Sequence, residues 1–222
     1  MQNLRNFRTI RISLDKQMDL DALYAGNAFA FPGRQGQMFF FKAIDPSDKE
    51  KIRQGFAMLS AKSVYSRFFT YLKELTEQQL DELVNADQYR HVVWGAFDLL
   101  NGEPFGVGIG RYVRDSEKPD SAEMAITIVD KYHSQGIGTI MLAILYHLAR
   151  RSGIRHLTGI ALGINMPLLL RFQAMGGAIE RSGHEYLIDL PVFEKTSMLP
   201  DTTYATIIAP IIDFLDQHPL CT

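Results

Sequence analysis

Gly136 and Gly138 stand where a predicted strand turns into a predicted helix, in the segment HSQGIGT of residues 133–139. The first amides of a helix have no partner within the helix, and the helix dipole places partial positive charge there. Glycines let an anion approach such amides without meeting a Cβ atom. The pattern therefore predicts a phosphate-binding turn, although Gly-x-Gly alone also occurs in ordinary turns.

The elements on both sides of this turn support the prediction. Residues 122–129 are rich in β-branched side chains, which is typical of a strand with at least one buried face. Residues 137–151 place apolar side chains at helical spacing. Ser152-Gly153 then ends the helix, and Arg150 and Arg151 lie in its last turn, where positive charge is favourable.

The rest of the chain surrounds this unit with further strands and helices. Strands are predicted at 38–44, 91–99, 103–111, 156–162, 178–181 and 186–190. Helices are predicted after a cap at Asp45 or Ser47, from Ser60, from a capping box at Thr76, and at 165–175. Asn101-Gly102 is a strong hairpin signal. A hairpin beside a βαβ unit predicts an α/β (α+β) fold, with a mixed, mostly antiparallel sheet, a central parallel crossover and helices on both faces.

Three regions are expected along the chain. Residues 1–36 are an extension with a candidate strand at 7–14, a candidate helix at 19–25 and a turn-rich connector, Phe29–Gln37. Residues 37–193 form the main domain. Residues 194–222 form a tail with a short amphipathic helix that starts near Ala209, because Pro210 fits a first helical position. Its apolar stripe is expected to pack on the chain's own domain, with a dimer contact as the second alternative.

Composition limits the classes of partner. The chain has 222 residues, of which 46% are hydrophobic, and a net charge of −2, so no overall basic field favours nucleic acid or a membrane surface. The single cysteine, Cys221, excludes an internal disulfide framework. No apolar run approaches the roughly 20 residues of a membrane span, and the N-terminus lacks a signal-peptide core. We expect a cytoplasmic protein without a bound metal, either a monomer or a homodimer.

The motifs resemble those of the GCN5-related N-acetyltransferase (GNAT) superfamily. The acyl-CoA signature of that family is Gln/Arg-x-x-Gly-x-Gly/Ala at a strand-to-helix turn. Both glycines match here, and His133 replaces the leading Gln or Arg. A second signature is an Asn that opens the next helix, then an aromatic residue and Gly-Phe. Asn165 matches it, Phe172 stands for the usual Tyr, and Gly176-Gly177 replaces Gly-Phe.

A narrower resemblance is to bacterial protein lysine acetyltransferases of the Pat type. Their GNAT domains often carry a Ser-x-x-Ser-x-Tyr-x-Arg-Phe segment, which is reproduced by Ser60, Ser63, Tyr65, Arg67 and Phe68. They also carry an Ala-Glu-Phe-Ala strand before the CoA turn, matched by AEMA at 122–125. Together the resemblance covers roughly residues 38–192.

The resemblance implies acetyl-CoA as the cofactor, with its pyrophosphate on backbone amides from about Ser134 to Thr139. His133 is either a further phosphate donor or an exposed loop histidine. Phe172 packs against the pantetheine or the core. The oxyanion would meet a backbone amide near Ile128 or Val129. The residues implied at the cofactor are Ile128, Val129, His133, Ser134, Gln135, Gly136, Ile137, Gly138, Thr139, Asn165 and Phe172.

Acetyl transfer to an amine needs a base, because an amine with a pKa near 10 is protonated at pH 7. Glu123 is the candidate, since it precedes the cofactor turn and matches the Pat-type catalytic Glu; the alternative is a solvated strand glutamate. A general acid is not identified, because Phe172 cannot donate a proton; Tyr132 and Tyr186 are weaker alternatives.

The resemblance therefore implies an acetyl-CoA-dependent N-acetyltransferase acting on an amine, with a protein lysine as the preferred acceptor. Tyr65, Arg67 and Phe68 lie where acceptor sites are usually built, although helix packing explains them equally well. Two alternatives stay open. One is transfer to a small amine or amino acid. The other is an inactive acetyl-CoA-binding sensor, suggested by the departures at His133, Phe172 and Gly177.

Overall fold

The computed structural model describes residues 28–34, 36–100 and 103–217. Within these residues the chain forms one eight-stranded sheet with the order β1-β2-β3-β4-β5-β6-β8-β7. The strands are β1 (Ala28–Pro32), β2 (Met38–Ala43), β3 (His91–Leu100), β4 (Glu103–Arg114), β5 (Ser121–Ile128), β6 (His156–Leu162), β7 (Ala178–Ser182) and β8 (Glu185–Pro191). Neighbouring strands are antiparallel except for the parallel pair β5 and β6. The predicted mixed sheet with one parallel crossover is confirmed.

The strands β5 and β6 separate soon after they begin. Their paired residues are Ser121–Glu123 and His156–Thr158. Beyond this point β5 stays paired with β4 as far as Ile128, and β6 stays paired with β8 as far as Leu162. The sheet therefore opens between the carboxyl-terminal halves of β5 and β6, beside the turn that leads into the next helix.

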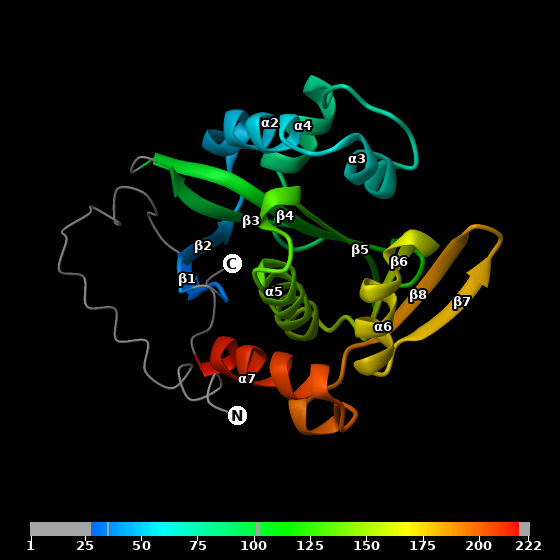
Figure 1. The fold of residues 1–222 in the computed structure, drawn as a ribbon. Helices are drawn as coiled ribbons and strands as arrows, with labels where there is room; N and C mark the ends of the chain where they lie inside the picture. The colour runs from blue at the N-terminus through cyan, green and yellow to red at the C-terminus, as the bar shows by residue number, and fades with distance from the viewer. Residues whose placement is uncertain (1–27, 35, 101–102, 218–222) are drawn as a thin grey trace.

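Helices cover both faces of the sheet (Figure 1). One face carries α2 (Lys49–Ala57), α3 (Ala61–Phe68) and α4 (Glu77–Val84). The other carries α5 (Ile137–Arg151), α6 (Met166–Ala174) and α7 (Thr203–Gln217). Single 3-10 turns are η2 (Pro46–Asp48), η3 (Asp130–Tyr132), η4 (Gly163–Asn165) and η5 (Thr196–Met198). This arrangement confirms the expectation of helices on both faces.

The main core lies between the sheet and α5. Side chains of a strand alternate between its two faces, so Trp94 and Ala96 of β3 join the core on the α5 side, whereas Val93 and Phe97 pack on the α2–α4 side. The helix α5 is buried along most of its length. It is therefore held rigidly, and its first turn is a fixed support for a binding site.

Local sequence signals predicted several boundaries correctly. Ser60 caps α3 by accepting a hydrogen bond from the Ser63 amide, and Thr76 forms the predicted capping box with Gln79. Asp45 caps η2. Each signal acts within one turn of chain, so the sequence alone was sufficient to read it.

Two local predictions are wrong. The segment expected to be a connector contains β1, which pairs with β2 from Ala28 to Pro32. The tail helix begins at Thr203 and not near Ala209, so Pro210 lies inside α7. Proline removes one helical hydrogen bond, but Ile208, Ile211, Ile212 and Leu215 are buried in the main core and stabilise the helix. The apolar stripe of the tail thus packs on its own domain, as expected.

The candidate strand at 7–14 and the candidate helix at 19–25 lie outside the described residues. Among the helices of the described part, none has the length and apolar character needed to cross a membrane.

Candidate active site

The turn before α5 presents a row of backbone amides. Gly136 is the N-cap of α5 with φ +98°, a conformation that favours glycine, and Ser134 also has a positive φ of 63°. The amides of residues 134–138 have no acceptor in the described part of the chain, whereas the Thr139 amide donates to the Gly136 carbonyl oxygen at 3.0 Å. The predicted amide cradle is therefore formed by residues 134–138, and the prediction that the Thr139 amide belongs to it is wrong.

A cavity of about 290 Å³ lies directly over this turn. A Cβ atom added at Gly138 would meet nothing closer than Ile128 Cγ1 at 3.9 Å, so packing within the protein does not require glycine there. Gly138 lines the cavity together with Ser134, Gly136 and Asn165, so the space that a Cβ atom would occupy stays open to the cavity. The geometry suits the close approach of a phosphate group to the backbone.

Two arginines and a tyrosine of this cavity were missed by sequence reasoning. Arg34, from the loop between β1 and β2, lies against the turn: its amide donates to the Gln135 carbonyl at 3.1 Å. Arg171 of α6 lies 5.8 Å from the ring centre of Tyr204 of α7, and the Tyr204 hydroxyl contacts Thr139 Oγ1 at 3.3 Å. Burial raises the pKa of the Tyr204 hydroxyl. Both arginines are close enough to lower that pKa, but by a smaller amount.

His133 is turned toward the backbone. Its Nε2 lies 2.9 Å from the Ile128 carbonyl oxygen, and because a carbonyl can only accept, Nε2 carries a hydrogen and donates it. The imidazole therefore bridges the end of β5 and the turn. The cationic side chains that line the cavity over the turn are those of Arg34 and Arg171.

A second cavity, of about 370 Å³, lies in the opening between β5 and β6. Its walls come from both strands, from Asn165 at the start of α6, and from the buried ring of Phe172. His133 and Ile128 line this cavity and the cavity over the turn, so the two spaces are neighbours. An elongated ligand with its phosphates on the turn can extend along β5.

The backbone hydrogen bonds of β5 distinguish between the two candidate oxyanion donors, the amides of Ile128 and Val129. The Val129 amide donates to the Val107 carbonyl oxygen at 2.9 Å, so the prediction that it can bind an oxyanion is wrong. Because hydrogen-bonded pairs alternate along antiparallel strands, the amide of the preceding residue, Ile128, points away from β4. It points toward the side on which β6 has already diverged. Ile128 therefore remains the candidate donor.

Glu123 lies at the last residue of β5 that pairs with β6, and its side chain is exposed into the second cavity. Arg67 of α3 lines the same cavity and is close enough to Glu123 for the carboxylate to raise the arginine's pKa. Burial, followed by the guanidinium of Arg111, outweighs this effect and lowers the pKa of Arg67 to about 10. Glu123 and two guanidinium groups thus lie on the α2–α4 side of the opening.

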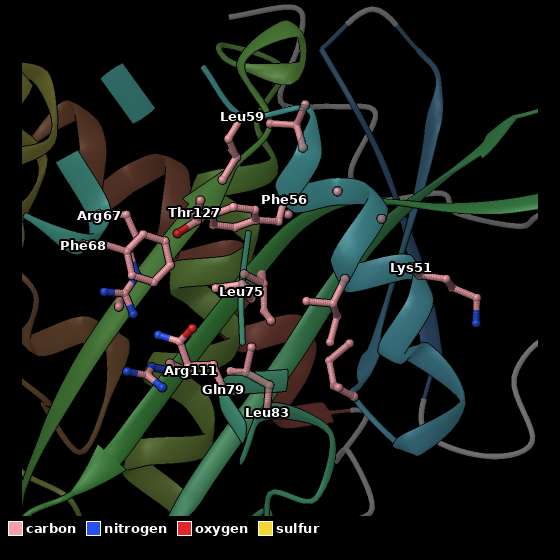
Figure 2. A pocket seen from close by; sticks show the side chains of 18 of the residues that line it. Lys51, Phe56, Leu59, Arg67, Phe68, Leu75, Gln79, Leu83, Arg111 and Thr127 are labelled. Atoms are coloured by element: carbon pink, nitrogen blue, oxygen red, sulfur yellow. The ribbon is translucent and has the colours of Figure 1, made fainter. Parts of the chain in front are cut away.

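A third cavity, of about 220 Å³, lies between α2, α4 and the sheet. Its walls are mostly apolar and include Phe56, Leu75 and Phe97. Figure 2 shows that the polar ends of Arg67, Arg111 and Gln79 gather on one side of it, while Lys51 points away. Arg67, Ala125 and Thr127 line both this cavity and the one between β5 and β6. The third cavity therefore adjoins the site from the side opposite the cofactor turn.

Of the three predicted acceptor residues, two line these cavities. Arg67 lines two of them, and Phe68 lines the third cavity and contacts Phe56 edge-on at 5.8 Å. Tyr65 stacks on Tyr71 at 5.0 Å, and it lines none of the three cavities formed by the described residues. The structure thus brings Arg67 and Phe68 to the site and leaves Tyr65 outside it.

Tyr132 is a poor source of a proton for a leaving group. It lines the cavity over the turn, but its hydroxyl donates to Asp98 Oδ2 at 3.0 Å. Burial and the Asp98 carboxylate raise the pKa of Tyr132 to about 12. The hydroxyl is therefore held as a donor to Asp98.

The two serines of the Ser-x-x-Ser segment fasten α3 to the cofactor turn. Asp130, in η3, accepts hydrogen bonds from the Ser60 amide at 2.9 Å, Ser60 Oγ at 2.7 Å and Ser63 Oγ at 2.8 Å. Burial alone would raise the pKa of Asp130, but these bonds outweigh it and lower that pKa. Asp130 thus joins the start of α3 directly to the segment that leads into the turn before α5.

The site geometry agrees with a comparison against known protein families. The family described as "Acetyltransferase (GNAT) family" matches residues 58–172, which is more than half of the chain and runs from before α3 into α6. The chain belongs to the GNAT acetyltransferase family. The matched region contains Glu123, the amide turn and Asn165.

Curated relatives place the chain near the Pat-type GNAT proteins. It is 28% identical to the acetyltransferase Pat of Mycolicibacterium smegmatis over 171 residues, covering 76% of this chain and 50% of Pat. It is 30% identical to an acetyltransferase of Pseudomonas aeruginosa over 122 residues, covering 55% of this chain and 65% of that protein. The chain thus spans half of one relative and less than two thirds of the other.

A solved structure supports the fold. The GNAT domain of S. lividans PAT superposes with a TM-score of 0.67 at 21% identity, covering 74% of this chain and 96% of that domain. The predicted GNAT fold and the resemblance to Pat-type proteins are confirmed.

Proposed function

We propose that this protein is an acetyl-CoA-dependent N-acetyltransferase. Membership of the GNAT family supports acetyl transfer from acetyl-CoA. The observation that carries the proposal is the opening between β5 and β6, which begins at Glu123 and leads to the free amides before α5. A phosphate anchor, a channel and a carboxylate base are thereby arranged in sequence along a single strand.

In this proposal, the amides of residues 134–138 bind the pyrophosphate, with Arg34 and Arg171 beside it. The pantetheine arm follows β5 through the opening, between Asn165 and Phe172. The thioester oxygen then lies near the Ile128 amide, which stabilises negative charge as it develops. These contacts orient the thioester carbon toward the side of the sheet on which Glu123 lies.

The chemical step is a direct displacement. The acceptor ammonium loses one proton through Glu123, directly or through water. The nitrogen lone pair attacks the thioester carbon; the new C–N bond forms, the C–S bond breaks, and CoA leaves as a thiolate. The nitrogen loses its remaining excess proton, and the thiolate takes a proton from solvent. No general acid is required, because a thiol with a pKa near 8.5 is a tolerable leaving group at neutral pH.

A protein lysine is the first candidate acceptor, supported by the similarity to Pat-type proteins. A small amine or amino acid is the second candidate. It is favoured by a specific observation: the third cavity is bounded by the helices α2 and α4 and carries two guanidinium groups at one side.

Calorimetric titration of the purified protein with acetyl-CoA tests the proposal. We expect a dissociation constant on the order of micromolar. Gly138→Glu places a carboxylate where the pyrophosphate would lie and should weaken binding about 100-fold or more through like-charge repulsion. The variant should still fold, because a side chain at this position meets only Ile128 at ordinary contact distance.

Ala57→Glu, which adds the same charge on an exposed position of α2, is the matched control and should bind normally. The proposal fails if millimolar acetyl-CoA produces neither heat nor thermal stabilisation. Tight binding without transfer to any acceptor would favour a sensor instead of an enzyme.

A further inference from the structure

The third cavity contains two cations without a partner carboxylate at ion-pair distance. Four charged side chains line it: Lys51, Arg67, Glu82 and Arg111. Lys51 pairs with Asp48 at 2.8 Å, and Glu82 accepts a hydrogen bond from Gln78 at 3.1 Å. Arg67 lies 5.1 Å from the ring centre of Phe68, but neither Arg67 nor Arg111 has a carboxylate at ion-pair distance among the described residues. Partly buried charges that lack a counter-charge are costly, so this pair is suited to an anion.

The two arginines stand between Glu123 and an apolar pocket. Arg111 pairs with Ala125 across β4 and β5, two residues along β5 from Glu123, and Arg67 approaches from α3. Behind them the pocket is lined by buried side chains, including Phe56, Leu75 and Phe97. The order in space is therefore a carboxylate, two guanidinium groups and an apolar cavity.

We infer that this pocket binds a free α-amino acid with an apolar side chain, and that this amino acid is an acceptor of the acetyl group. The α-carboxylate lies on Arg67 and Arg111, the α-amine faces Glu123 and the thioester, and the side chain fills the apolar cavity. The inference rests on the acetyl transfer proposed above and names its acceptor class.

Charge complementarity favours this ligand over an isolated lysine side chain. The polar ends of Arg67 and Arg111 lie together at one side of the pocket, so an ammonium that enters there alone meets like charge. An α-amino acid brings its own carboxylate, one bond from the carbon that carries the amine. Arginine binds a carboxylate through two parallel hydrogen bonds. The same contact therefore neutralises the arginines and fixes the amine next to the base.

The reaction balances without another reactant. The α-ammonium loses one proton to Glu123, the amine attacks the thioester carbon, the C–N bond forms and the C–S bond breaks. The products are the N-acetyl amino acid, CoA thiol and one proton released to solvent.

The test compares acceptors that differ only in the carboxylate. Release of CoA thiol and the product mass are measured with acetyl-CoA and either L-leucine or L-phenylalanine, and then with L-leucinamide or L-phenylalaninamide. We expect kcat/KM to be about 10- to 100-fold higher for each acid than for its amide, the range typical of charged hydrogen bonds. Glycine should be a poor acceptor because it leaves the apolar cavity empty.

Variants identify the carboxylate contacts. Arg111→Gln and Arg67→Gln should each raise KM for L-leucine about 10- to 100-fold and reduce the preference for the acid over the amide, whereas acetyl-CoA affinity stays unchanged. Arg181→Gln is the matched control. It removes an exposed arginine from the edge strand β7, which is not a neighbour of the strands that line the pocket. Thermal melting of each variant separates lost recognition from lost folding.

The outcomes distinguish this inference from the proposed function. Acetylation of protein lysines without acetylation of free amino acids overturns the inference and leaves acetyl transfer intact. Equal rates for L-leucine and L-leucinamide also overturn it. Absence of acetyl-CoA binding removes both proposals together.

Discussion

Glu123 lies at the last residue of β5 that pairs with β6, at the end of the strand away from the turn before α5 and near the guanidinium group of Arg67. Glu123 belongs to strand β5, whereas Arg111 belongs to β4 and Arg67 to α3. Because Glu123 is part of the sheet, the position of its carboxylate is not defined by a loop. Sites on strands hold their geometry well. A change at this single side chain should therefore alter the chemistry and leave the binding of acetyl-CoA intact.

Glu123→Gln is expected to lower kcat about 100- to 10,000-fold, the usual range for loss of a general base. Acetyl-CoA affinity measured by calorimetry should stay within about twofold. The loss should shrink at alkaline pH, because the acceptor amine then deprotonates without help. Glu180→Gln, on the exposed edge strand β7, is the control. Unchanged turnover in Glu123→Gln would remove this residue as the base.

We expect Arg34 and Arg171 to supply positive charge to the phosphates, because the imidazole of His133 donates to the backbone instead. Arg34→Gln and Arg171→Gln are each expected to weaken acetyl-CoA binding about 10- to 100-fold, with a reduced dependence on salt. Since both line the cavity over the turn that we propose binds the pyrophosphate, the loss should be equal for acetyl-CoA and for 3′-dephospho-acetyl-CoA. A loss confined to the 3′-phosphorylated ligand would contradict this placement. Arg155→Gln, on an exposed arginine with a side chain 64% accessible, is the control.

At the scale of elements, the cofactor turn and α3 behave as one unit because Asp130 joins them. The turn, its strand and its helix were predictable, since glycines, β-branched runs and helical spacing act locally. The pairing of β1 with β2, which brings Arg34 to the turn, was not predictable. The contact itself joins Arg34 to Gln135, which are 101 positions apart in the sequence, and no local pattern around Arg34 indicates it.

Asp130→Ala is expected to lower the free energy of unfolding by about 1–3 kcal/mol, because it leaves the Ser60 amide and two hydroxyls without their acceptor. It should also raise KM for the acceptor, since α3 carries Arg67. The pKa of Asp130 is lowered in the folded state, so its stabilisation is complete above the usual aspartate pKa and is lost as pH falls through the lowered value.

Thermal melting at pH 7 and at pH 3 measures this contribution. Asp115→Ala, which removes another aspartate that accepts backbone hydrogen bonds in a loop, is the control and should leave KM unchanged. Identical KM values for Asp130→Ala and the native chain would show that α3 is positioned by other contacts.

At the scale of the whole molecule, α7 lies along α5 and contacts it near both ends. Near the cofactor end Tyr204 reaches Thr139, and near the far end Asp216 contacts His147 and Arg150. Segments from opposite ends of the described chain, Arg34 and Tyr204, thus meet at one cavity. The apolar stripe of α7 predicted that it would pack on the domain, but periodicity contains no information about which helix end would meet the ligand.

His147 makes this packing sensitive to acid. The side chain is 1% exposed, its Nδ1 lies 2.8 Å from Asp216, and burial lowers its pKa despite that carboxylate; Arg150 and Arg151 lower it further. The folded state therefore binds fewer protons than the unfolded state just below the usual histidine pKa of about 6.5. Stability is complete above that value and is lost as pH falls from it toward the lowered folded pKa.

His147→Gln keeps a donor for Asp216 but does not titrate, so its melting temperature should fall less than that of the native chain between pH 7.5 and 5.5. His156→Gln, at an exposed histidine beside Asp189, should keep the native slope. Since α7 carries Tyr204 into the cofactor cavity, acetyl-CoA should also bind the native chain more weakly at pH 5.5, and His147→Gln should reduce this loss. Coinciding melting slopes for His147→Gln and the native chain would mean that other groups control the acid response.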